Sequence, residues 1–290
     1  MKRRSFLGML AGTPLAFGGA VPARARGLRV ASLDYALAQT LIALGVTPVG
    51  ITDARDWNLW VVEPPLPAET VDLGASVSPN LELLAALEPD LVLTTDYTAM
   101  SEPQVGRIAP VERFSLFSEG GSPLPKAMEA MTRIGALVGR EREARLYLEE
   151  TEAVFAECAA RAAPFRERPL LLMSFLDPRH VRVYARPGLH QDVLDRLGLR
   201  NAWQGGANVW GFASVGIERL AEAGEALAIA DHLPPDVRVV LEASPLWRSL
   251  PLRRDRGPIP VLPPVLSFGG VPAARRLAGL LVETLEGQAA

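Results

Sequence analysis

The sequence is poor in the residues that most metal and disulfide sites require. It holds one cysteine, Cys158, and three histidines among 290 residues. A single cysteine excludes an intrachain disulfide and a cysteine-rich metal cluster. The histidines also lack the close spacing of two ligands on one helix; they are His180, His190 and His232. We therefore expect no metal ion bound directly by protein side chains.

The chain also lacks an excess of positive charge and the short motifs of several enzyme classes. Its 30 basic and 33 acidic residues give a formal net charge of −3, so the basic surface typical of nucleic-acid-binding proteins is not expected. No GxSxG, GxxxxGK[ST] or GxGxxG segment occurs. We expect neither a nucleic-acid partner nor catalysis, although a triad built from distant residues would leave no local motif.

The N-terminal segment has the three parts of a signal peptide. MKRRSFLGMLAGTPLAFGGAVPARA begins with basic residues, continues with an apolar stretch too short to span a membrane, and ends on Ala-Arg-Ala. The Arg3-Arg4 pair is typical of a twin-arginine signal, with an ordinary secretory signal as the alternative. Cleavage after Ala25 would remove four basic residues and no acid from residues 1–25, which changes the formal charge from −3 to −7. We expect a soluble, acidic protein in the periplasm.

Short apolar segments alternate with helical patterns over most of the remaining chain, which predicts an α/β fold. Strands are expected at 28–34, 46–52, 71–74, 90–94, 169–176, 181–185, 227–230 and 258–263. Helices are expected at 35–45, near 81–88, at 190–198, near 218–223 and at 273–287. The pattern predicts two α/β lobes with mainly parallel sheets and a ligand cleft between them.

A nearly continuous helical pattern separates these two halves. Charged and apolar residues alternate at helical spacing from Pro123 to Phe165, and the second part has no Gly or Pro for more than 20 residues. Such a helix would be roughly 35 Å long and stiff. We therefore predict an N-terminal lobe at 26–138, one long connecting helix at 139–166 and a C-terminal lobe at 167–290.

One local pattern occurs in both halves. When Glu82 is aligned with Glu218, each glutamate follows a polar loop, begins about two turns of helix and precedes an apolar strand. Glutamate is favourable in a first helical turn because it faces the positive end of the helix dipole, and this explains each residue locally. Equivalent positions in two lobes further suggest that both carboxylates contact one partner.

Aromatic residues in polar loops are the strongest ligand signal. Ligands of open α/β sheets bind outside the carboxyl ends of the strands. Tyr97 follows such a strand end, and Trp210 lies in the glycine-rich NAWQGGANVWGF segment, so both are expected in a ligand wall. Trp60 and Trp203 fit a ligand wall or the packing of their own loops equally well. Trp247 is expected to be structural.

Several motifs resemble those of one family. LWVVEPPLP, VDLG with PNLELL, RIAP, LDPRH, NAWQG with N-WG, and SPLW resemble the periplasmic ferric hydroxamate (ferrichrome-type) siderophore-binding proteins of ABC importers, from about residue 28 to the C-terminal helix. The resemblance implies two lobes joined by one long helix with limited hinge motion. It also implies a protein, expected to be monomeric, that delivers a ferric siderophore to an inner-membrane permease. The siderophore would hold the iron, so no cofactor is expected.

The resemblance also assigns residues. It places ligand-binding side chains at Tyr35, Trp60, Tyr97, Asn208 and Trp210. In the family two glutamates pair with permease arginines, and these correspond to Glu82 and Glu218.

The chain departs from the family pattern at two pocket positions. Ser76 stands where the family has an arginine that binds the hydroxamate oxygens, and we keep Ser76 as a ligand-binding candidate. Leu266 replaces a pocket tryptophan, with Phe268 two residues later as a further ligand-binding candidate. Arg55 or Arg186 would compensate for the missing arginine, or the ligand would be neutral or cationic. The alternatives are the same fold binding haem, cobalamin or a ferric catecholate, and an exported siderophore hydrolase.

Overall fold

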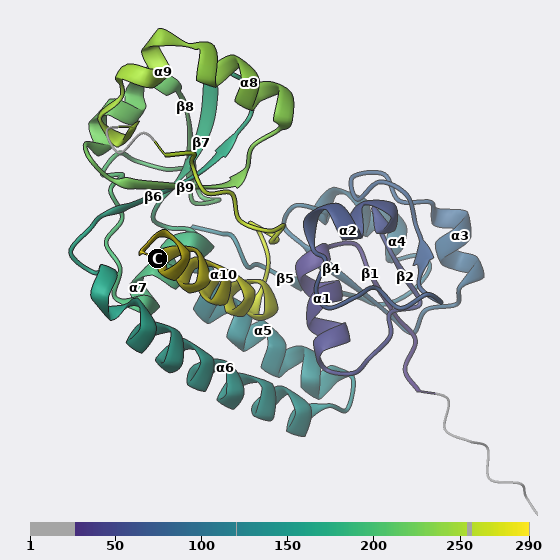
Figure 1. Cartoon of the computed structure of the whole chain (residues 1–290). Coiled ribbons are helices and arrows are strands. Elements are labelled where there is room, and N and C mark those ends of the chain that lie inside the picture. The colour runs from purple at the N-terminus through teal and green to yellow at the C-terminus, as the bar shows by residue number, and fades with distance from the viewer. Residues whose placement is uncertain (1–26, 120, 254–256, 290) are drawn as a thin grey trace, which may run out of the picture.

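The computed structural model describes residues 27–119, 121–253 and 257–289. The predicted signal peptide, residues 1–25, lies outside these ranges. Figure 1 shows two lobes, each built around its own sheet, with a group of helices running between and beneath them. In the described part of the chain, no helix is both long enough and apolar enough to cross a membrane.

The N-terminal lobe contains a five-stranded sheet in the order β3-β2-β1-β4-β5, and every pairing in it is parallel. Its strands are β1 (Val30–Ser32), β2 (Gly50–Ile51), β3 (Val71–Asp72), β4 (Leu91–Thr95) and β5 (Val111–Phe114). Its helices are α1 (Tyr35–Ala43), η1 (Ala54–Asp56), α2 (Trp57–Trp60), α3 (Leu81–Ala86), η2 (Ala99–Ser101) and α4 (Glu102–Val105). The central strands β1 and β4 are entirely buried, as expected for a parallel sheet covered on both faces.

The C-terminal lobe contains a four-stranded sheet in the order β8-β7-β6-β9. Its strands are β6 (Leu170–Phe175), β7 (His180–Tyr184), β8 (Phe212–Gly216) and β9 (Leu227–His232). Strand β6 is parallel to β9, whereas β7 is antiparallel to both β6 and β8. The sheet is mixed because residues 176–179 alone join β6 to β7, and a parallel crossover needs a dozen or more residues.

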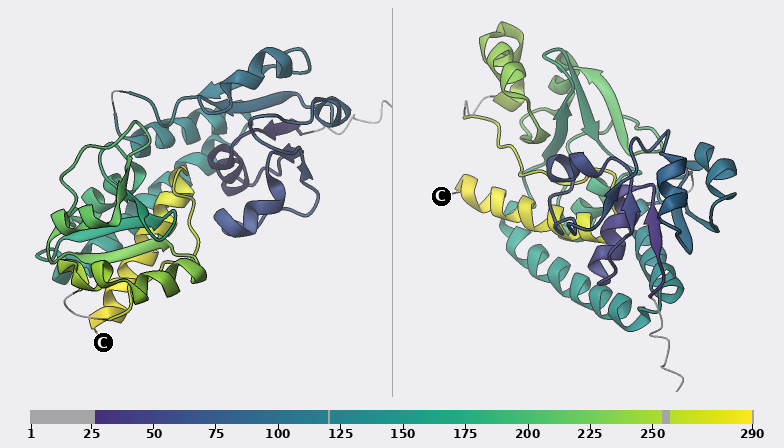
Figure 2. Two further views of the ribbon diagram at one scale, coloured as in Figure 1. Left: turned by 90° about the horizontal axis from the view of Figure 1, so that it is seen from above. Right: turned by 90° about the vertical axis from the view of Figure 1, so that its right-hand side faces the viewer.

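Four helices form the layer that joins the lobes: α5 (Pro123–Leu137), α6 (Glu141–Ala162), α7 (Leu189–Leu197) and α10 (Val271–Ala289). The predicted long helix is confirmed as α6, whose 22 residues correspond to roughly 33 Å. It packs against the other three helices, and Figure 2 shows α10 lying beside it. Its buried residues recur at helical spacing: Ala144, Thr151, Phe155, Cys158 and Ala162. The connection between the lobes is therefore a packed helical layer and not a single free rod.

The remaining elements all follow α6 along the chain, and the structure differs from the prediction at two places in this part of the chain. They are η3 (Ala163–Phe165), η4 (Ile217–Ala223), α8 (Pro235–Ala243), α9 (Pro245–Ser249) and η5 (Pro251–Arg253). The helix predicted near Glu218 is a 3-10 helix, and strand β8 precedes it where a polar loop was expected. The strand predicted at 258–263 is reduced to one bridge between Ala230 and Val261, since its prolines lack the N–H groups that a sheet ladder needs.

Candidate ligand-binding cleft

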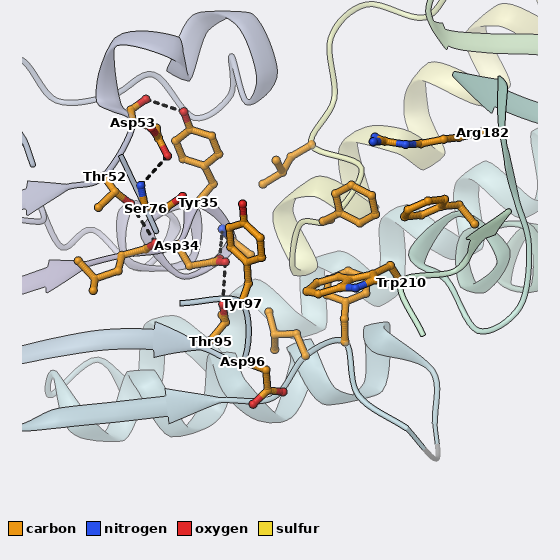
Figure 3. A pocket seen from close by; sticks show the side chains of 17 residues that line it. Asp34, Tyr35, Thr52, Asp53, Ser76, Thr95, Asp96, Tyr97, Arg182 and Trp210 are labelled. Carbon is orange, nitrogen blue, oxygen red and sulfur yellow. Dashed lines mark hydrogen bonds between the residues drawn. The ribbon is translucent and has the colours of Figure 1, made fainter. Parts of the chain in front are cut away.

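A cavity of about 510 Å³ is lined by residues of both lobes. All five strands of the N-terminal sheet contribute at or just beyond their carboxyl ends, where open α/β sheets place ligands. These residues are Leu33, Asp34, Tyr35, Ala36, Thr52, Asp53, Ser76, Thr95, Asp96, Tyr97, Leu116 and Phe117. The C-terminal lobe supplies Arg182, Trp210, Phe212, Leu266 and Phe268. Figure 3 shows the two sets facing each other across the cavity.

The N-terminal wall is polar and internally hydrogen-bonded. Asp34 caps helix α1: one carboxylate oxygen accepts from the Ala36 N–H at 2.8 Å and the other from the Thr95 hydroxyl at 3.0 Å. Burial raises the pKa of Asp34 despite these bonds. The Tyr35 hydroxyl donates to the carbonyl of Asp53, and the Ser76 N–H donates to the Asp53 carboxylate at 3.1 Å. Burial and the nearby carboxylates raise the pKa of Tyr35, so its hydroxyl stays protonated at neutral pH.

The facing wall is aromatic and continues across the cleft. Trp210 stacks on Phe117 with ring centroids 5.6 Å apart. Tyr97 contacts the Trp210 ring edge-on, with ring centroids 6.1 Å apart. Phe268 contacts both Trp210 and Phe117 edge-on at 5.9 Å. Because Tyr97 and Phe117 belong to the N-terminal lobe, the cluster joins the two lobes at the base of the cavity. Such surfaces supply apolar contact area for a ligand.

Arg182 also lines the cavity, although no sequence motif pointed to it. It lies in the middle of β7, and its guanidinium lies over the ring of Phe212 at 4.9 Å. Val181 and Val183 on either side belong to the core of the lobe, so the alternation of a strand turns Arg182 to the opposite face. The sequence signal for Arg182 was a charged residue between two valines in a predicted strand.

Five of the seven predicted ligand-binding residues line the cavity: Tyr35, Ser76, Tyr97, Trp210 and Phe268. Leu266, the second position of departure, also lines it. Trp60 lies elsewhere; it is exposed, and its ring centroid is 5.8 Å from that of His232 in the other lobe. Asn208 is also outside the lining and shapes the loop instead, since its side-chain oxygen accepts from the N–H groups of Trp210 and Phe212.

The arginines suggested as compensation are engaged outside the cavity. Arg55 pairs with Asp72 at 3.4 Å, and Arg186 pairs with Asp195 at 2.5 Å. Trp203 is buried in the core of the C-terminal lobe, so for this residue the structure supports packing over a ligand wall.

Glu82 and Glu218 are both exposed and both lie in the first turn of a short helix. Asn80 caps α3 by accepting from the Leu83 N–H, so the cap does not use the carboxylate of Glu82 in the same turn. Glu218 folds back over Gly216, and its carboxylate occupies the space that a Cβ atom at residue 216 would need. Figure 1 places α3 on the outer side of the N-terminal lobe, and η4 packs on α9 and β8 in the other lobe.

A buried polar network supports the aromatic wall from behind. Asp231 accepts hydrogen bonds from the hydroxyls of Tyr184 at 2.7 Å and Ser267 at 2.8 Å. His190 lies 3.6 Å from the same carboxylate oxygen. Ser267 therefore donates to the carboxylate and not to the histidine, unlike the serine of a hydrolytic triad. Over the described ranges, no three His, Cys, Asp or Glu side chains are grouped as metal ligands.

Comparisons with known proteins agree with this architecture. The family model described as periplasmic binding protein matches residues 30–251. The Escherichia coli iron(3+)-hydroxamate-binding protein FhuD is 34% identical over 262 residues, which is 90% of this chain and 88% of that protein. The E. coli Fe(3+) dicitrate-binding periplasmic protein FecB is 27% identical and covers 77% of this chain and 72% of its own length.

Solved structures show the same two-lobed fold. The siderophore-binding protein FhuD of Vibrio cholerae, solved with Fe3+-Desferal, superposes with a TM-score of 0.84 at 29% identity and covers 90% of this chain and 98% of its own. Staphylococcus aureus SirA in complex with staphyloferrin B gives a TM-score of 0.68 at 19% identity, covering 91% and 94% of the two chains. The chain belongs to the periplasmic binding protein family.

Proposed function

We propose that this protein captures a ferric siderophore of hydroxamate type in the periplasm and delivers it to the permease of an ABC importer. The observation that carries the proposal is the cavity of about 510 Å³ between the lobes, with an aromatic wall on one side and polar groups on the other. Its size lies within the range typical of small-molecule sites. The resemblance to two FhuD proteins, one solved with Fe3+-Desferal, supports a hydroxamate ligand.

The residue types in the cavity suit a chelate that carries its own iron ligands. A hydroxamate siderophore surrounds iron with oxygen atoms, so the protein has to bind the organic surface and the outer lone pairs only. Trp210, Phe212 and Phe268 offer apolar contact to that surface. Arg182 and Tyr97 offer hydrogen-bond donors. The protein would perform no chemistry on the ligand, and we expect it to act as a monomer.

Delivery would use the two exposed glutamates. Each lobe presents one carboxylate at the N-terminal turn of a short helix, Glu82 on α3 and Glu218 on η4. Arginines of a permease would pair with both, so that the two lobes dock together.

Tryptophan fluorescence of residues 26–290 tests the ligand class, because Trp210 lies in the cavity wall. The protein is titrated with ferrichrome, ferrioxamine, a ferric catecholate, haem and cobalamin. Saturable quenching by a ferric hydroxamate, with a much weaker response to the iron-free form, is the expected result. If another chelate quenched the fluorescence saturably and neither hydroxamate did, the proposed ligand class would be wrong, whereas the proposed transport role would remain.

A further inference from the structure

The cavity has an asymmetric distribution of charge. Asp34, Asp53 and Asp96 contribute carboxylates from the N-terminal side, and no basic residue is found among the described residues that line this side. Arg182 from β7 is the basic residue of the facing wall. Figure 3 shows Arg182 across the cavity from Asp34 and Asp53. A bound ligand would therefore experience opposite charges at its two ends.

Arg182 is available to a ligand. Its Nε is buried without a hydrogen-bond partner, and within the described ranges its guanidinium has no carboxylate partner. Its contact is with the face of Phe212, which holds the guanidinium plane without using its N–H donors. A buried donor without a partner is costly, so a ligand oxygen placed there would gain a charge-assisted hydrogen bond and relieve that cost.

Ser76 cannot supply such a bond from the other wall. A serine has one hydroxyl donor and no charge, whereas a guanidinium presents five N–H donors in a fixed planar fork. The Ser76 N–H is already donated to Asp53, which places a carboxylate next to this position. The N-terminal wall is therefore suited to a donor or a cation, and the oxygen-binding group lies on the opposite wall.

We propose that Arg182 binds the iron-coordinating oxygens from the C-terminal lobe and that Asp53 faces a protonated amine of the ligand. This deepens the proposed function and rests on it: the preferred substrate class is a ferric hydroxamate that carries a free ammonium group. The iron centre lies toward β7 and β8, and the amine-bearing arm lies toward the ends of β2 and β3. Chelates with net negative charge are disfavoured by the same carboxylates.

The test compares two probes that differ in one charge: ferric desferrioxamine B, which has a terminal ammonium, and its N-acetylated form. Dissociation constants are measured for the mature protein and three variants. Arg182→Gln keeps most of the stem but removes the charge. Asp53→Asn keeps an acceptor for Ser76 and suits the left-handed backbone at residue 53, where φ is 53°. Arg186→Gln is the matched control, because Arg186 pairs with Asp195 outside the cavity.

Arg182→Gln is expected to weaken both probes by roughly 10- to 100-fold, the effect of losing a hydrogen bond to a charged group. Asp53→Asn is expected to weaken the ammonium probe by about 3- to 10-fold and to leave the acetylated probe within about twofold, in line with a partly solvated ion pair. Arg186→Gln should change neither. Thermal midpoints of the ligand-free variants serve as the folding control, and Arg182→Lys repeats the test if the glutamine variant is unstable.

Two failures are distinguishable. If the wild-type protein binds a ferric hydroxamate but Arg182→Gln and Arg182→Lys bind both probes as tightly as it does, the assignment of Arg182 is wrong and the proposed function stands. The amine preference is overturned if Asp53→Asn affects both probes equally or neither. If the wild type binds no ferric hydroxamate at all, the proposed ligand class itself fails.

Discussion

The imidazole of His190 stacks face to face on the phenol ring of Tyr184, with ring centroids 3.7 Å apart and ring planes 6° from parallel. Both side chains also approach the buried carboxylate of Asp231. Ser267 donates to the same carboxylate and lies between Leu266 and Phe268, which line the cavity. The hydrogen bond to Ser267 thus connects the cavity wall to a buried carboxylate that does not itself line the cavity.

Removing that carboxylate should destabilise the protein and weaken ligand binding together. Asp231→Ala leaves the buried hydroxyls of Tyr184 and Ser267 without their acceptor, at a cost of about 2–4 kcal/mol. Urea unfolding measures the stability, and fluorescence titration measures the affinity. Asp177→Asn is the control, since Asp177 pairs with His180 at the exposed start of β7. Unchanged stability in Asp231→Ala would contradict the role of this network.

The same carboxylate should give a signature at acid pH. Burial alone would raise the pKa of Asp231, but the neighbouring His190 and the hydroxyls of Tyr184 and Ser267, which donate to the carboxylate, lower it below its ordinary value of 3.8. A carboxyl with a lowered folded pKa stabilises the protein above its unfolded pKa and loses that contribution as the pH falls through the folded value. The difference in unfolding free energy between wild type and Asp231→Asn should therefore shrink below about pH 3.8. If the difference in unfolding free energy did not change with pH, the negative charge of Asp231 would not contribute to stability.

Trp210 is expected to contribute to both affinity and the fluorescence response. Trp210→Ala removes the ring that stacks on Phe117 and contacts Tyr97, so the dissociation constant should rise roughly 10- to 100-fold. Trp60→Ala is a matched control, because Trp60 lies outside the cavity lining. Calorimetry separates the loss of binding from the loss of the fluorophore. Equal affinities for the two variants would contradict the aromatic wall.

Charge reversal at the proposed docking residues should separate binding from transport. Glu82→Lys combined with Glu218→Lys should abolish uptake of the ferric siderophore by cells while the purified protein binds it normally. Glu143→Lys with Glu149→Lys makes the same change of charge on the exposed face of α6 and should leave uptake unchanged. Uptake that survives in the first variant would refute docking through these carboxylates.

The alternating pattern of apolar strands and helices was sufficient to predict the two lobes and the long helix. The antiparallel direction of β7 was missed, although the strands expected at 169–176 and 181–185 already leave too few residues between them for a parallel crossover. Strand β5 was not predicted because Glu112 and Arg113 interrupt its apolar residues. These charged residues are tolerated because β5 is an edge strand of the sheet.

The cavity was predictable where a residue follows a strand end and less so elsewhere. Tyr35 and Tyr97 lie three and two residues beyond the ends of β1 and β4, so the topology alone places them at one edge of the sheet. Arg182 lies within a strand, and its exposure to the cavity depends on the packing of the second lobe against the first. Trp60 was assigned to the ligand site by resemblance. In the structure its ring contacts His232 of the other lobe, and such a contact depends on how the lobes are placed, which no local sequence pattern encodes.

Asp192 links two helices of the layer between the lobes, and its pH dependence should be opposite to that of Asp231. Its carboxylate lies in the first turn of α7 and accepts from the Leu124 N–H at 2.8 Å, so it caps the N-terminus of α5. Burial raises the pKa of Asp192 above 3.8 in spite of that bond. Stability linked to a raised carboxyl pKa is present at low pH and is lost as the pH rises through the folded value.

Two substitutions separate the cap from the charge. Asp192→Ala removes the cap and should cost about 1–2 kcal/mol at neutral pH. Asp192→Asn keeps an acceptor for the Leu124 N–H without a buried charge, so its stability relative to wild type should increase as the pH rises above about 3.8. Urea unfolding between pH 3 and 7 measures both effects. A relative stability of Asp192→Asn that falls over this range would mean that the ionised carboxylate is the favoured state at this junction, and the cap would then depend on its charge.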